Sequence, residues 1–80
     1  MKTAAQQWAS FEAIVMPASA GDVQRMEMRR AFYAGFHSAL ACALEAADES
    51  GDNDDLGATM IERLHQECAQ FAREVQAGRA

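Results

Sequence analysis

The sequence predicts an all-α protein in which a short N-terminal helix precedes a long antiparallel helical hairpin. The first observation is the stretch from Arg25 to Ala47, which holds no proline, a single glycine and many good helix formers. The second is the polar segment SGDNDD at residues 50–55, which separates this stretch from another amphipathic stretch. We therefore expect one domain over residues 1–80, with helices at about 4–15, 20–49 and 54–76.

The first helix is predicted by its start, its stripe and its end. Thr3 and Gln6 fit the capping-box pattern at its start. Pro17 ends it, because the residue before a proline avoids the helical conformation. Its apolar residues follow helical spacing: Trp8, Phe11 and Val15. A helix this short needs a packing partner, and Trp8 is interpreted as its anchor.

The second helix has two different apolar faces. Ser19 and Asp22 repeat the capping pattern, so we expect the helix to begin near Ala20. One face is bulky: Phe32, Tyr33, Phe36, Leu40, Ala43, Leu44 and Ala47. The other is smooth: Ala31, Ala34, Gly35, Ser38, Ala41 and Cys42. We expect the bulky face to take the third helix and the smooth face to be only partly covered by the first helix.

The third helix begins after the polar loop. Asp52 or Asn53 is expected to cap it, with Asp54 and Asp55 favourably placed at its positive N-terminus. One apolar stripe follows: Leu56, Met60, Leu64, Cys68, Phe71 and Val75. The helix is expected to end near Gly78.

Composition favours self-association. Half of the residues are hydrophobic, but 18 of those 40 are alanine, so the core of this small domain is thin. A second helix of thirty residues is about 45 Å long, which exceeds the dimensions of one compact domain of this size. We therefore expect a homodimer or a larger oligomer that assembles through the central helix.

Charge and apolar patterning narrow the classes of partner. The net charge of −5 argues against nucleic acid as a partner. No run of 18 apolar residues is present, so no membrane partner is expected. Cys42 and Cys68 are interpreted as reduced thiols of a cytoplasmic protein.

No pattern of a metal or catalytic site emerges from the sequence. His65 and Cys68 lie one turn apart, but His37 and Cys42 do not share a helix face with each other. Phosphate-binding glycine loops are absent, and neither cysteine has the context of a catalytic nucleophile. We expect no enzymatic activity, no metal and no cofactor.

An arginine cluster is the one irregular feature of the second helix. Arg29 falls in the middle of the bulky face. Arg30, Tyr33 and His37 form an adjoining stripe at i, i+3 and i+7. Guanidinium groups bind phosphate and aromatic rings stack on bases. Arg29, Arg30, Tyr33 and His37 are therefore the candidate ligand-binding residues.

A purely structural role for Arg29 stays open. In an antiparallel hairpin, Arg29 faces a position near residue 73 of the third helix. Glu67 and Glu74 border the apolar stripe of that helix, and either one fits an ion pair with Arg29.

The run RRAFYAGF at residues 29–36, with WASFEAIVMPASAG before it and LHQECAQF after it, resembles a group of small phage-encoded helical proteins of unknown function. The resemblance covers residues 8–75 and implies an accessory protein made in the cytoplasm of an infected bacterial host. Several kinds of such proteins counter host immunity. Some sequester cyclic or ADP-ribose-type nucleotides in symmetric helical oligomers, and others bind a host protein.

Three functions follow as hypotheses. The first is a non-enzymatic protein that antagonises host defence by sequestering a nucleotide signal in a homo-oligomer. The second is an inhibitor or adaptor whose acidic surface binds a basic host defence protein; its loop region carries Asp48, Glu49, Asp52, Asp54 and Asp55. The third is a structural accessory without a ligand.

Overall fold

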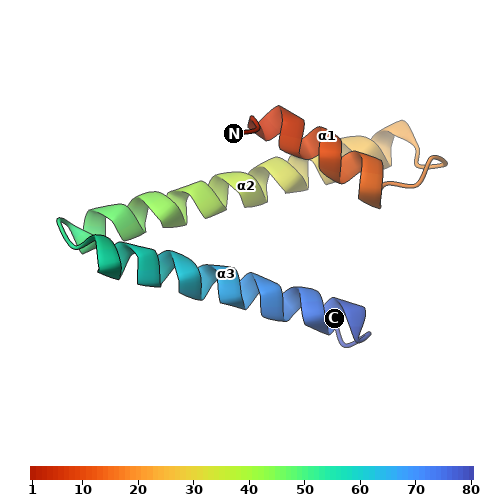
Figure 1. Ribbon diagram of the computed structural model, residues 1–80. Helices are drawn as coiled ribbons and strands as arrows, with labels where there is room; N and C mark the ends of the chain where they lie inside the picture. The colour runs from red at the N-terminus through yellow and green to blue at the C-terminus, as the bar shows by residue number, and fades with distance from the viewer. The chain divides into compact units, whose positions relative to one another are not determined.

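The computed structural model describes residues 1–80 and contains three α-helices and no strand, which confirms the all-α class (Figure 1). The helices are α1 (Ala4–Val15), α2 (Asp22–Ser50) and α3 (Asp54–Gln76). The chain divides into two compact units, Met1–Ala41 and Cys42–Ala80. The long helix α2 contributes its first part to one unit and its last part to the other.

The ends of α1 and α2 follow from local hydrogen bonds. The capping box at Thr3 is confirmed, because the Thr3 hydroxyl accepts from the Gln6 amide at 3.1 Å and Gln6 Oε1 accepts from the Thr3 amide at 2.9 Å. Helix α2 begins later than the sequence predicted. The Ala20 amide donates to the Pro17 carbonyl at 3.0 Å, which closes a turn before the helix starts at Asp22.

Aromatic rings form the core of the Met1–Ala41 unit. Trp8 is only 8% exposed. Its ring centre lies 5.7 Å from that of Phe11 and 5.6 Å from that of Phe32 on α2. Phe11 and Phe32 are 5.2 Å apart, which closes a three-ring cluster. The role of Trp8 as a packing anchor is confirmed. Stacked and tilted ring pairs stabilise such a cluster beyond the area that they bury.

This cluster corrects the assignment of the helix faces. The bulky face of α2 was predicted to take the third helix, but its residue Phe32 packs against Trp8 and Phe11 of α1. The reason is that α1 gains more by burying its rings against another ring than against alanine. Further along the same face, Ala43 and Ala47 line a hollow with Gly57, Ala58 and Ile61 of α3, as predicted. The smooth face is left open: Ala31, Ala34, Gly35, Ser38, Ala41 and Cys42 are all exposed.

A tight turn joins α2 to α3 in the Cys42–Ala80 unit. Gly51 has a φ of 55°, which glycine adopts without strain. The Asn53 side chain accepts from the Leu56 amide at 3.0 Å, so the predicted cap of the third helix is confirmed at Asn53. Ala46, only 2% exposed, is the buried residue of this unit.

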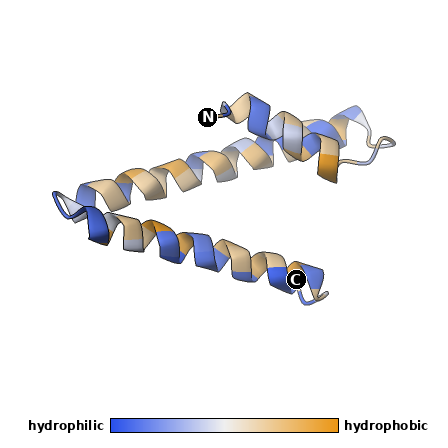
Figure 2. Ribbon diagram, in the orientation of Figure 1, coloured by the Kyte–Doolittle hydropathy of each residue, from blue (hydrophilic) through white to orange (hydrophobic).

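Close packing in this unit is concentrated beside the turn. A Cβ atom on Gly57 would lie 3.0 Å from Ser50 Oγ, so the two helices approach each other closely there. Apolar and hydrophilic residues alternate along α3 (Figure 2). Leu64, Phe71 and Val75 of its predicted apolar stripe are exposed. The free thiol of Cys68 is exposed as well. Antiparallel pairing along the full length of a hairpin stays a prediction.

No helix is both long enough and apolar enough to cross a membrane.

Candidate ligand-binding site

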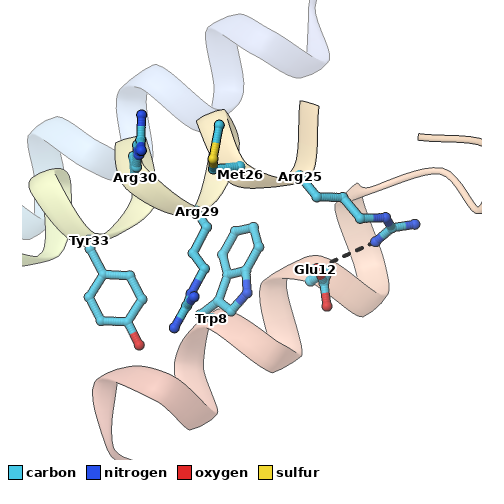
Figure 3. A pocket seen from close by; sticks show the side chains of 7 residues that line it. All are labelled: Trp8, Glu12, Arg25, Met26, Arg29, Arg30 and Tyr33. Carbon is cyan, nitrogen blue, oxygen red and sulfur yellow. Dashed lines mark ion pairs between the residues drawn. The ribbon is translucent and has the colours of Figure 1, made fainter. Parts of the chain in front are cut away.

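A groove in the Met1–Ala41 unit brings the arginine cluster together with α1. Its volume is about 650 Å³, within the range of small-molecule sites. Seven residues line it (Figure 3): Trp8, Glu12, Arg25, Met26, Arg29, Arg30 and Tyr33. We refer to this feature as the arginine groove.

Helical spacing places these side chains. Trp8 and Glu12 lie four residues apart on α1, so both project from one side of that helix. Arg25, Arg29 and Tyr33 follow the same spacing on α2. The groove therefore has one wall from each helix, and the aromatic core beneath it holds the two walls together.

Arg25 is engaged by the protein itself. Its Nη1 lies 3.3 Å from Glu12 Oε2, and the side chains of this ion pair are 32% and 35% exposed. Its Nη2 donates to the Pro17 carbonyl at 3.0 Å and its Nε to the Ala20 carbonyl at 3.3 Å. Arg25 thus joins α1, the interhelix turn and α2. We call the Arg25–Glu12 pair the latch.

Arg29 lies over an aromatic ring. Its guanidinium carbon is 5.6 Å from the centre of the Tyr33 ring, a cation–π distance. In the view of Figure 3, its side chain extends between Tyr33 and the Trp8 indole. Arg29 forms no ion pair, so its N–H donors are available to a ligand.

Arg30 is exposed and forms neither a hydrogen bond nor an ion pair. The lining holds three arginines and one glutamate, which gives a net charge of +2 in a chain whose net charge is −5. Glu12 offsets Arg25. The positive charge that a ligand meets therefore comes from Arg29 and Arg30.

The other lining residues supply apolar surface. Met26 is 43% exposed, and Tyr33 is half-buried. Trp8 is too deeply buried to offer a ring face, so it forms part of the floor. The combination of free guanidinium groups and an apolar wall fits a ligand that carries both an anionic group and a flat ring.

The structure brings together three of the four predicted ligand residues. Arg29, Arg30 and Tyr33 line the groove, whereas His37 lies outside its lining and is exposed. A role for His37 in binding stays a prediction. Glu12 also lines the groove, although no ligand role was predicted for it. Its place four residues after Trp8 was the signal that linked it to the same face of α1.

The pairing of Arg29 with Glu67 or Glu74 stays a prediction, because it would join the two units. Within its own unit, Glu74 Oε2 is 2.6 Å from Arg79 Nε. Hydrogen bonds from Arg79, and then from Gln70, lower the pKa of the Glu74 carboxyl.

The fold and the groove together describe a small all-α protein with a basic groove beside an aromatic cluster. No three side chains of His, Cys, Asp or Glu come together as a metal site. Comparisons of the chain with protein-family models, curated proteins and solved structures found no match.

Proposed function

We propose that this protein is a non-enzymatic phage accessory protein that antagonises host defence by sequestering a nucleotide signal. The observation that carries the proposal is the arginine groove, in which Arg29 and Arg30 stand unpaired beside Tyr33. The phage origin is suggested by the resemblance of the RRAFYAGF run, and a role in defence is suggested because several kinds of small phage proteins counter host immunity.

The chemistry of the groove supports a nucleotide as its ligand. Arginine presents planar N–H donors that match the oxygens of a phosphate. Met26 offers apolar surface against which a base packs, and the Tyr33 ring lies beside the guanidinium of Arg29. The volume of about 650 Å³ accommodates a nucleotide. Binding without turnover agrees with the lining, in which the one carboxylate, Glu12, is paired with Arg25.

We propose further that the chain works as a homo-oligomer assembled through α2. Small residues let two helix backbones approach closely, and the smooth face of α2 offers six of them in exposed positions. A Cβ atom on Gly35 would have no neighbour within 4 Å, so this face is open to a second copy. Copies that associate in this way would each carry an arginine groove.

Isothermal titration calorimetry on the purified full chain tests the proposal. The probes are cyclic dinucleotides and ADP-ribose derivatives. We expect one of them to bind, and Arg30→Ala to weaken that binding about tenfold. Arg63→Ala is the matched control, because Arg63 is exposed on α3 outside the groove and should leave affinity unchanged. Absence of binding by every nucleotide would contradict the proposal.

A second candidate function is an inhibitor or adaptor that binds a basic host protein. Exposed carboxylates surround the turn between α2 and α3, where Asp52, Asp54 and Asp55 line a shallow hollow. Co-purification of a single host protein, lost when these three residues are changed to asparagine or serine, would favour this function. Nucleotide binding would be absent in that case.

A further inference from the structure

Glu12 is the only carboxylate in the arginine groove. Its Oε2 lies 3.3 Å from Arg25, and its side chain is 35% exposed. No donor within the chain hydrogen-bonds to Oε1. A carboxylate oxygen accepts up to two hydrogen bonds, so Glu12 keeps unused acceptor sites. These sites lie in the same groove as the two unpaired guanidinium groups.

The two ends of the groove differ in charge, because Glu12 lies at one end and the unpaired Arg29 and Arg30 lie at the other. Along α2, Arg29 and Arg30 lie four and five residues beyond Arg25, which holds Glu12. Four residues of α-helix rise about 6 Å. A phosphate is attracted to Arg29 and Arg30, whereas the neutral Arg25–Glu12 pair at the other end does not attract it. The separation suits the ribose that stands between phosphate and base in a nucleoside monophosphate.

The bases differ in what they offer to a carboxylate. Guanine presents two adjacent N–H donors, from N1 and the 2-amino group, on one edge. Adenine presents one amino donor beside the N1 acceptor, whose lone pair a carboxylate repels. Charge-assisted N–H···O⁻ bonds are stronger than neutral ones, and an unpaired buried donor or acceptor costs affinity.

We infer that Glu12 is the specificity-determining residue of the groove and that it selects a guanine nucleotide. The carboxylate accepts the guanine N–H pair while Arg29 and Arg30 hold the phosphate. This inference rests on the nucleotide-binding function proposed above. It assigns Glu12 two roles, since the same side chain forms the latch with Arg25.

Calorimetry with guanosine and adenosine 5′-monophosphates separates the two roles. The two probes share phosphate and ribose, so the ratio of their affinities reports on the base edge alone. We expect the wild-type chain to bind the guanosine nucleotide about tenfold more tightly. Because the ratio is measured within one variant, a loss of folded protein cancels from it.

Two variants break the ion pair between Arg25 and Glu12, but only one of them keeps the Glu12 carboxylate as a hydrogen-bond acceptor. Glu12→Ala removes both the latch and the carboxylate, and its affinity ratio should fall to about one. Arg25→Gln breaks the latch and keeps the carboxylate, so it should bind both nucleotides more weakly and retain the guanine preference. Equal affinities in the wild type, or the same ratio in both variants, would overturn the inference while leaving nucleotide binding intact. If neither these probes nor the signalling nucleotides bind, the proposed function fails with it.

Discussion

The guanidinium carbon of Arg29 lies 5.6 Å from the centre of the Tyr33 ring, one helical turn further along α2. The ring holds the planar group in place without neutralising its charge. An arginine held in this way loses little side-chain entropy when it binds a phosphate.

Arg29→Lys should weaken nucleotide binding about tenfold, although it preserves the charge. Lysine lacks the planar fork that binds two phosphate oxygens and stacks on a ring. Calorimetry against the best-binding nucleotide measures the effect. Arg63→Lys on α3 makes the same chemical change outside the groove and should have none. Equal loss in both variants would show that the arginine groove is not the site.

Trp8→Ala should destabilise the Met1–Ala41 unit by about 3–5 kcal/mol, because it leaves a cavity against Phe11 and Phe32. A cost of this size is a large part of the total stability of a small domain. Urea unfolding followed by far-ultraviolet circular dichroism measures it. Ile14→Ala is the control, since Ile14 on the same helix is 84% exposed and should change stability by less than about 0.5 kcal/mol.

Features that depend on near neighbours in the chain could be predicted from the sequence. The capping box at Thr3 and the cap at Asn53 involve residues three positions apart, so residue types alone indicate them. The start of α2 was predicted near Ala20, but Ala20 belongs to the turn closed by the Pro17 carbonyl, and the Gly21 carbonyl accepts the hydrogen bond from the Arg25 amide at the start of the helix.

The α1 wall of the groove depends on tertiary packing and could not be predicted. Arg25 and Glu12 are thirteen residues apart on different helices, and they meet only because Trp8 and Phe11 pack on Phe32. Periodicity showed which side of each helix is apolar. Periodicity did not show that α1 would pack against the aromatic face of α2, because α1 and α3 each carry an apolar stripe that could pack there.

Gly57→Ala should change stability little on its own and should stabilise the chain when Ser50 is alanine. Alanine gains about 1 kcal/mol of helix propensity over glycine. A Cβ atom on Gly57, however, would lie 3.0 Å from Ser50 Oγ. Ser50 must then rotate and lose its hydrogen bond of 3.1 Å to the Ala47 carbonyl.

A double-mutant cycle of Ser50→Ala and Gly57→Ala measures this coupling by thermal unfolding. We expect Gly57→Ala to stabilise the Ser50→Ala background by about 1 kcal/mol. An identical effect of Gly57→Ala in both backgrounds would mean that the two helices do not approach closely at the turn.

The C-terminal end of α3 should loosen in acid. The hydrogen bond from Arg79, and then that from Gln70, lower the pKa of Glu74 below its ordinary value of 4.5. The folded state therefore binds the proton less tightly than the unfolded state. The stabilisation is fully present above about pH 4.5 and is lost as the pH falls through the lowered pKa.

Amide chemical shifts of Gly78 and Arg79 between pH 6 and pH 2 follow this loosening, because the Arg79 amide donates to the Glu74 carbonyl at 2.9 Å. Glu74→Gln should abolish the transition below pH 4.5. Glu62→Gln, an exposed change on the same helix, should preserve it. A transition that survives in Glu74→Gln belongs to another carboxyl group.

Gly35→Leu should convert the proposed oligomer into monomers. A Cβ atom at Gly35 meets nothing within 4 Å in the single chain, so the larger side chain fits there without strain. It would block the close approach of a second α2, since small residues are what permits two helices to pack at short distance.

Light scattering should report a mass above 8.7 kDa for the wild type and a monomer for the variant. Arg63→Leu adds an apolar side chain on the solvated side of α3 and should leave the oligomer intact. A strictly monomeric wild-type chain would show that there is no oligomer. A Gly35→Leu variant that still associates would show that the interface lies elsewhere.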